Sequence, residues 1–394
     1  MNHVNSLTHE DHRMLDEQEL IDSAKALSGQ FYDRADEIEQ ARRLPPDVAQ
    51  LMAEAGFYRM GAPAAVGGLE TPPTVSSQVF ELLAQGDASA AWVAFIGMTS
   101  YTSLAALPAA VGREILADPN TLMTGVFAPT GKADKVDGGF RVSGRWQWGS
   151  GSQNAAWVMG GVMLTDGGEP MLDRHDRPRS TMVLMPASEL EYLDTWHVSG
   201  LCGSGSLDYQ AQDLFVPEER VVGYSRHDAV PRTRLHAFPN FTLLALGIGA
   251  VCMGIARAAI DELVALAASK KRVGARKTIA EQQLSQITLA QAEADLRSAR
   301  AFYFETLEAA WRCSENDQKI TVEQRRDLRL ATTNAVMKSV GVVEDMYNLG
   351  GGSAVYQTSR LQRYFRDINV AKTHIMVSNQ ILETVGALYF GLEP

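Results

Sequence analysis

The spacing of apolar and polar residues divides the chain into three stretches. From about residue 16 to 120, apolar residues recur at helical spacing, as in EQELIDSAKALSGQFYDRADEIEQARRL, and PPDVAQLMAEAGF opens with prolines suited to a first helical turn. Between about 121 and 222, short β-rich runs such as GFRVSGRWQWGS and STMVLMP alternate with Gly, Pro and Asp. From about residue 237 helical spacing returns in long runs. We therefore predict an N-terminal all-α domain (1–120), a central antiparallel β-domain (121–230) and a C-terminal helical domain (231–394).

One apolar run raises the question of a membrane span. The segment FTLLALGIGAVCMGIA, residues 241–256, ends at Arg257, short of the ~20 apolar residues that a spanning helix needs. We therefore predict a buried core helix and no membrane segment. The first twenty residues, MNHVNSLTHEDHRMLDEQEL, carry charges where a secretion signal needs an apolar core, so a cytoplasmic protein is expected.

Composition and motifs argue against several classes of protein. The 47 acidic residues exceed the 36 basic ones, and the net charge of -11 disfavours general affinity for nucleic acid or anionic membranes. Cys202, Cys252 and Cys313 are scattered, and the histidines lack ligand spacing, so neither a disulfide framework nor a metal site is expected. No GxGxxG turn is complete and no P-loop occurs, so a cofactor must be held in another way.

Four segments carry motifs that can be compared with a known family. They are VDGGFRVSGRWQWGSG (136–151), WHVSGLCGSGSLDYQAQDLFVP (196–217), KRVGARKTIAEQQLSQITLA (271–290) and YNLGGGSAVYQTSRLQRYFRD (347–367). Together, and in this order, they resemble the acyl-CoA dehydrogenase superfamily over nearly the whole chain. The resemblance implies an acyl-CoA dehydrogenase-like fold, in which the C-terminal domain is a four-helix bundle and the chains form a homotetramer.

The resemblance also implies a flavin between the sheet and the bundle, whose phosphate and adenine ends are reached by a neighbouring subunit. Carried over by position, Arg272 faces phosphate, while Gln283, Gly350 and Gly351 border the distal end of the cofactor. The fork of donors on Arg suits phosphate, and paired glycines let the backbone approach a ligand closely.

A dehydrogenase of this family needs a carboxylate base, and both of its usual positions are empty here. The region after the Arg-Asp pair reads INVAKTHIMVSNQ, and no Asp or Glu lies between Asp228 and Asp261. His374 stands near the first of these positions. An acyl-CoA dehydrogenase or oxidase with a displaced base, such as Glu383, is the alternative, and a scaffold that lacks flavin is a third hypothesis.

The double absence resembles the two-component monooxygenase branch of the superfamily. Those enzymes take reduced FMN or FAD from a separate NAD(P)H:flavin reductase, form a C4a-hydroperoxyflavin with O₂ and oxygenate a small aromatic substrate. By resemblance, Trp148, Gly149 and Ser150 meet the flavin ring, with Ser150 beside N5. His374 would donate to the hydroperoxide or act as a base. An indole such as indole-3-acetate is the expected substrate, with a phenol second; ordinary turn and core roles for Ser150 and His374 are the competing interpretations.

Overall fold

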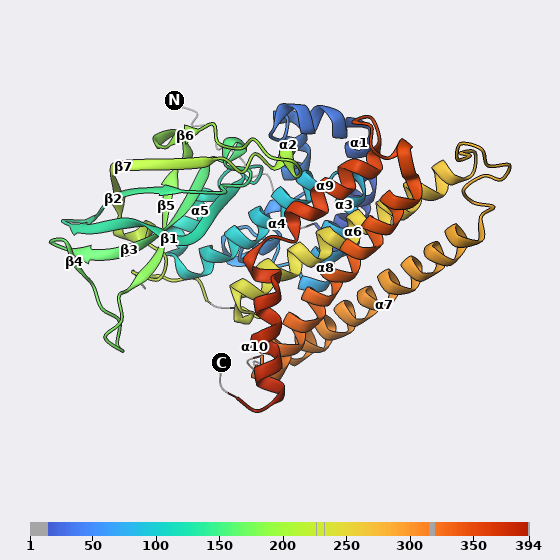
Figure 1. Ribbon diagram of the computed structural model, residues 1–394. Helices are drawn as coiled ribbons and strands as arrows, with labels where there is room; N and C mark the ends of the chain where they lie inside the picture. The colour runs from blue at the N-terminus through green and yellow to red at the C-terminus, as the bar shows by residue number, and fades with distance from the viewer. Residues whose placement is uncertain (1–14, 226, 232, 315–319, 393–394) are drawn as a thin grey trace, which may run out of the picture.

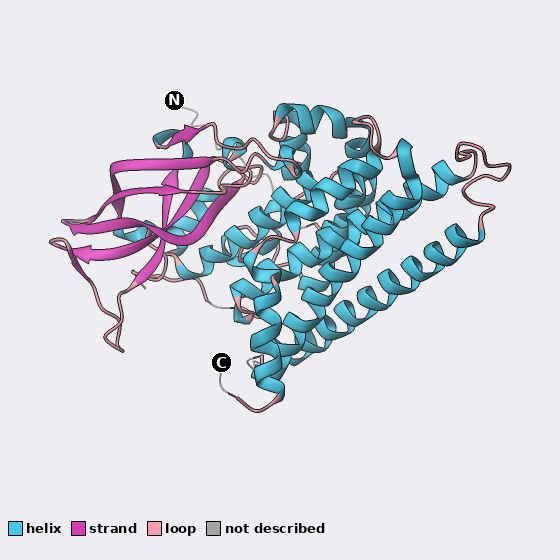
Figure 2. Ribbon diagram, in the orientation of Figure 1, coloured by secondary structure: helices cyan, strands magenta, loops and turns pink. Residues whose placement is uncertain are grey.

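Helices from both ends of the chain pack into one body, and a β-sheet lies at one end of it (Figures 1 and 2). The computed structural model describes residues 15–225, 227–231, 233–314 and 320–392. Most of the N-terminal segment that argued against a secretion signal therefore lies outside the described residues. The order of helices, sheet and helices confirms the predicted fold class.

The N-terminal helices start where the sequence provides caps or prolines. Asp16 and Glu19 form a capping box at the first helix, and Pro46 and Pro73 open the next two. Asp87 caps the fourth helix, because its side chain accepts a hydrogen bond from the Ala90 N–H at 2.8 Å. The helices are α1 (Glu17–Ala41), α2 (Pro46–Glu54), α3 (Pro73–Gly86), α4 (Ala88–Tyr101) and α5 (Ala109–Ile115).

The central sheet is mixed, so the prediction of an antiparallel sheet is wrong for one pair of strands. Strands β1 and β3 run parallel, whereas the pairs β1/β2, β2/β7, β6/β7, β3/β4 and β3/β5 are antiparallel. Runs of apolar residues do not reveal the direction of a strand, because parallel and antiparallel pairing can bury the same side chains. The strands are β1 (Met123–Val136), β2 (Gly139–Trp146), β3 (Trp157–Asp166), β4 (Glu169–Pro170), β5 (Ser180–Pro186), β6 (Glu191–Leu193) and β7 (Asp208–Pro217).

Trp146 fills the centre of the sheet's own core. Its ring stacks on Tyr209 with ring centroids 5.4 Å apart, and its indole N–H donates to the Gly161 carbonyl at 2.8 Å. Gly131 and Gly160 flank the ring, since a Cβ added at either would approach Trp146 to 2.5 or 2.4 Å. The position of β2, and of the turn that follows Trp146, therefore depends on the shape of this side chain.

The C-terminal helices form the bundle that the resemblance implied. They are α6 (Asn240–Ala267), α7 (Gln283–Cys313), α8 (Val322–Gly350) and α9 (Arg360–Ala371), with α10 (Asn379–Tyr389) packed on α8. In the described part of the chain, α6 is the one helix long and apolar enough to cross a membrane, but 94% of its apolar window is buried in the protein. The apolar run is thus the core helix that was predicted.

Ion pairs attach α9 to α1, which lies far away in sequence. Arg363 is buried and binds Asp36 and Glu39, the latter with Nε 2.6 Å from the carboxylate. Arg366 binds the same Glu39 at 2.8 Å. Because breaking a buried ion pair leaves an uncompensated charge, these contacts fix the place of α9 and of the segment that follows it.

Candidate active site

A tight turn after β2 carries three of the predicted site residues. Trp148 has a left-handed backbone (φ 64°) and is 67% exposed, an unfavourable combination for a bulky aromatic residue. Gly149 leaves no room for a side chain, because an added Cβ would lie 2.6 Å from the Tyr209 ring. The Gly149 N–H donates to the Leu207 carbonyl at 2.9 Å. Ser150 is buried, so the turn exposes a tryptophan and turns a serine inward.

Ser150 belongs to a chain of hydrogen bonds among buried side chains. The Trp92 indole N–H, from α4, donates to Ser150 Oγ at 3.1 Å. Ser150 Oγ lies 2.6 Å from Ser206 Oγ, which lies 2.7 Å from Ser204 Oγ. Ser204 Oγ donates to the Leu201 carbonyl at 2.7 Å. The serine is therefore held by two domains at once.

His374 follows α9 and packs against the same tryptophan. It caps the short helix Ile375–Val377, and its Nδ1 accepts a hydrogen bond from the Met376 N–H at 3.2 Å. Burial lowers the pKa of His374 to about 4, so the ring is neutral at neutral pH. Since Nδ1 accepts, the proton of the neutral ring is assigned to Nε2. The Trp92 and His374 rings meet edge to face, with centroids 6.1 Å apart.

A buried carboxyl group supports the loop that carries the serines. Asp367 accepts a hydrogen bond from the Leu201 N–H at 2.6 Å, and Leu201 has a left-handed backbone. Burial raises the pKa of Asp367 to about 7 and that of nearby Asp87 to about 6. Through this contact α9 fixes the residue whose carbonyl ends the hydroxyl chain.

The other four predicted site residues lie elsewhere. Arg272 is exposed in the connection between α6 and α7, and Gln283 is the first residue of α7. This connection is at the tip of the molecule opposite the sheet (Figure 1). Gly350 ends α8, and Gly351 follows with φ 55° in open space. Within one chain, therefore, the structure does not bring these residues to Ser150 and His374.

A small cavity joins the start of α7 to the end of α8. It has a volume of about 100 Å³ and is lined mainly by apolar side chains, among them Ile279, Leu289 and Leu349. Ser285 also lines it, and in the described part of the chain the buried Ser285 Oγ has no hydrogen-bond partner. The first turn of α7 and the last turn of α8 thus border one cavity, which leaves the Ser285 hydroxyl available to a ligand.

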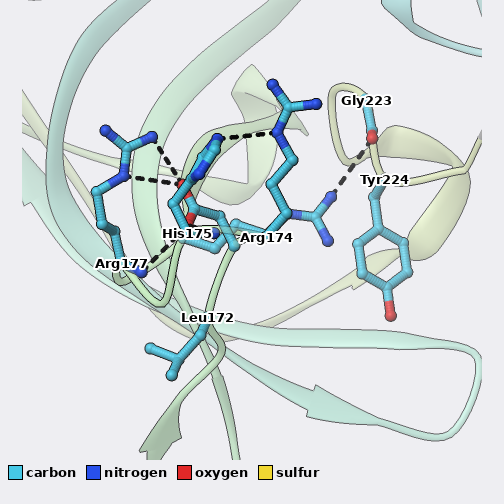
Figure 3. Close-up of a pocket in the computed structure, with 8 residues that line it drawn as sticks. Leu172, Arg174, His175, Arg177, Gly223 and Tyr224 are labelled. Atoms are coloured by element: carbon cyan, nitrogen blue, oxygen red, sulfur yellow. Dashed lines mark hydrogen bonds and ion pairs between the residues drawn. The ribbon is translucent and has the colours of Figure 1, made fainter.

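A wider cavity, of about 760 Å³, lies on the sheet domain (Figure 3). It is lined by the loop between β4 and β5, including Arg174, His175 and Arg177, and by Tyr224. Arg177 donates to Asp173 at 2.9 Å, so the loop neutralises part of its own charge. None of the predicted site residues lines this cavity. In the described part of the chain, no cluster of three or more His, Cys, Asp or Glu residues could hold a metal ion.

Comparison with known proteins identifies the family. The models of the acyl-CoA dehydrogenase N-terminal and C-terminal domains match residues 15–109 and 246–379. An indole-3-acetate monooxygenase of Pseudomonas putida is 34% identical over 94% of this chain and 94% of that protein. The chain belongs to the acyl-CoA dehydrogenase superfamily, among its flavin-dependent monooxygenases.

Two solved structures share the fold of this chain, and the first of them also supports the assignment. The oxygenase subunit HsaA of Mycobacterium tuberculosis, a flavin-dependent monooxygenase, superposes with a TM-score of 0.86 at 26% identity, covering 96% of this chain and 99% of that one. XiaF from Streptomyces sp., in complex with FADH2 and glycerol, superposes with a TM-score of 0.87 and 96% coverage of both chains. At 24% identity the latter likeness concerns the fold alone.

The site residues of this superfamily member are compatible with a flavin. The inward serine offers a polar atom, the exposed Trp148 offers an aromatic face, and its strained backbone is typical of a functional position. Away from the turn, the Ser285 hydroxyl has no partner in the described part of the chain, and a Cβ at Gly351 would meet no atom within 4 Å.

The sequence patterns did not single out Trp92, Ser204 or Ser206. All three are buried and contact Ser150 directly or through one hydroxyl. A signal was present, since Trp92 interrupts a run of small residues in ASAAWVAF and the two serines occupy the motif segment GSGS. Neither pattern could be linked to Ser150 from the sequence, because only the structure shows that α4 and the 201–207 loop meet at the turn that carries Ser150.

Proposed function

We propose that this monooxygenase transfers one oxygen atom from O₂ to a small aromatic substrate, an indole such as indole-3-acetate first and a phenol second. The reduced flavin, FADH2 or FMNH2, is supplied by a separate NAD(P)H:flavin reductase. The 34% identity with an indole-3-acetate monooxygenase supports the substrate class, and the similarity to HsaA, an oxygenase subunit, supports a separate reductase.

One observation carries the proposal: the cluster formed by Trp92, Ser150 and His374 offers hydrogen-bond donors and acceptors but no acid. In the described part of the chain, no hydrogen-bond partner of these three side chains is a carboxylate. Abstraction of an α-proton needs such a base within reach of the substrate. Glu383, the displaced base of the alternative hypothesis, is exposed on α10, and within the described residues it forms no hydrogen bond with this cluster.

The residues around the turn have separate roles in this proposal. A bound reduced flavin supplies the reaction with O₂, while the protein orients it and excludes water. Trp148 covers the ring, and Ser150 forms a hydrogen bond at flavin N5. His374, neutral and protonated on Nε2, acts as a hydrogen-bond donor to the oxygen being transferred and not as a base. Of the two roles that the sequence left open for His374, protonation on Nε2 supports the donor role.

The distal half of each flavin site comes from a neighbouring subunit in this proposal. Arg272 binds phosphate, and Gln283, Gly350 and Gly351 border the far end of the cofactor. The homotetramer that this requires is supported by Leu284 and Ile287, which are 64% and 66% exposed on one face of α7. The three cysteines of the described chain are free, which supports our further proposal of a cytoplasmic location.

Oxygen incorporation tests the function. Protein mixed anaerobically with FADH2 or FMNH2 is exposed to ¹⁸O₂ in the presence of indole-3-acetate, indole, a substituted phenol or an acyl-CoA. One labelled oxygen atom is expected in the indole product, with less in the phenol product. Label in neither aromatic class would refute the substrate assignment, and reduction of added FAD by an acyl-CoA would restore the dehydrogenase alternative.

A further inference from the structure

The hydroxyl chain behind Ser150 has a single direction. The Leu201 carbonyl can only accept a hydrogen bond. Ser204 Oγ, 2.7 Å away, must therefore donate its one hydroxyl proton to it. Ser204 must then accept from Ser206, at 2.7 Å. With the Ser206 proton used in this way, the 2.6 Å contact between Ser206 and Ser150 requires Ser150 to be the donor.

This order leaves Ser150 without a proton for a ligand. Its hydroxyl proton points to Ser206, and one of its lone pairs already accepts from the Trp92 indole N–H. A second lone pair remains. Ser150, Ser204 and Ser206 are all at least nine-tenths buried, so water does not compete freely for these protons.

Both ends of the chain are held in place, and the Leu201 carbonyl end keeps the chain from reversing. The Trp92 indole N–H can only donate, and it binds Ser150 at the end of the hydroxyl chain that lies away from Leu201. At the other end, Asp367 holds the Leu201 N–H at 2.6 Å, which fixes the residue whose carbonyl receives the last proton. Reversing the chain would turn the Ser204 proton toward Ser206 and leave two oxygen atoms without a proton between them over the 2.7 Å from Ser204 to the Leu201 carbonyl.

We propose that Ser204 and Ser206 are positioning residues that make Ser150 a pure hydrogen-bond acceptor, and so make the site select reduced over oxidised flavin. The proposal rests on the proposed function, in which Ser150 meets flavin N5. The N5 atom of a reduced flavin carries a hydrogen and donates, whereas N5 of an oxidised flavin can only accept. An acceptor-only Ser150 therefore stabilises the first and opposes the second.

Equilibrium binding tests this device without turnover. Dissociation constants for FADH2 and FAD, and for FMNH2 and FMN, are measured anaerobically in wild type and in Ser206→Ala. In the variant the Ser150 proton loses its acceptor and becomes available to N5 of oxidised flavin. The ratio of the oxidised to the reduced dissociation constant is expected to fall by about tenfold, the effect of one hydrogen bond.

Two further variants control for a structural effect. Ser204→Ala breaks the hydroxyl chain one residue further from Ser150 and is expected to lower the ratio less. Ser206→Cys preserves the shape of the side chain and replaces Ser206→Ala in the test if that variant unfolds at a low temperature. Ser339→Ala removes a buried hydroxyl on α8 that has no partner in the described chain, and its ratio is expected to equal that of wild type.

The outcomes separate the inference from the function beneath it. A wild-type protein that binds FADH2 or FMNH2 more tightly than FAD or FMN, combined with an unchanged ratio in folded Ser206→Ala and Ser204→Ala, would overturn the inference alone. A wild-type protein that binds neither redox state of either flavin would overturn the inference and the proposed function together.

Discussion

The indole N–H of Trp92 donates a hydrogen bond to Ser150 Oγ at 3.1 Å, across the boundary between the N-terminal helices and the sheet. The edge of the same ring meets His374, which comes from the C-terminal end of the chain. One side chain thus sets the relative positions of residues from all three parts of the fold. Changes at Trp92 should therefore affect the chemistry more than its distance in sequence suggests.

Trp92→Phe tests this link directly. The variant keeps an aromatic ring against His374 but loses the N–H donor, so the free energy of unfolding should fall by about 1 kcal/mol. Release of H₂O₂ per flavin oxidised should rise at the expense of oxygenated product. Trp157→Phe, on β3 beneath Arg220, is the matched control and should leave the product yield at the wild-type level. Equal yields in the two variants would remove Trp92 from the site.

Substitutions of His374 distinguish a donor from a base. His374→Gln keeps an N–H donor and should retain part of the product yield, whereas His374→Leu should lose about tenfold in product per H₂O₂ released. Because burial lowers the pKa of His374 to about 4, the wild-type yield should show no His374 titration between about pH 6 and pH 8. If the product yield of the wild type changes with pH in that range, and the change is absent in His374→Gln, the histidine acts as a base.

The lowered pKa of His374 also has a consequence for stability. The unfolded histidine titrates near pH 6.5, so the neutral buried ring contributes stability fully above that pH. This contribution is lost as the pH falls from about 6.5 toward about 4. Denaturant titrations of wild type and His374→Gln should therefore converge in acid, while parallel curves would exclude the burial of a neutral ring.

Asp367→Asn should change how stability depends on pH in the opposite direction. Burial raises the pKa of Asp367 to about 7, so its contribution is complete below the unfolded value near 3.9 and is lost as the pH rises through about 7. Asparagine keeps an acceptor for the Leu201 N–H without a charge. The variant should gain stability over wild type by roughly 1–2 kcal/mol between about pH 6 and pH 8. A constant difference over this range would contradict the assignment.

Gly149→Ala tests the packing under the turn. The added Cβ would lie 2.6 Å from the Tyr209 ring, which is stacked on Trp146 and cannot move freely. We expect a loss of about 1–3 kcal/mol in unfolding free energy and weaker binding of reduced flavin. Gly29→Ala, in α1 with no atom within 4 Å of the added Cβ, should be neutral or stabilising. Thermal melts and flavin titrations of both variants decide the matter.

Mixing two defective subunits tests whether each flavin site is shared. Ser150→Ala impairs the sheet half of a site and Arg272→Ala the distal half, so each variant alone should couple poorly. In randomly mixed oligomers about a quarter of the sites would carry neither change, and product yield should recover to about that extent. No recovery in oligomers whose mixing is verified by native mass spectrometry would show that Ser150 of one subunit and Arg272 of a neighbour do not share a flavin site.

Helical and β-rich spacing, proline and aspartate caps and four ordered motifs were sufficient to predict the three-part fold, the core helix α6 and the absence of the usual carboxylate base. These features are local, because capping, periodicity and composition act within a few residues. Only the tertiary structure decided that β1 and β3 run parallel, that Trp92 joins Ser150 to His374, and that Ser204 and Ser206 lie in one hydroxyl chain with Ser150. Such contacts join residues far apart in sequence, and the direction of a hydrogen bond depends on every partner in its chain.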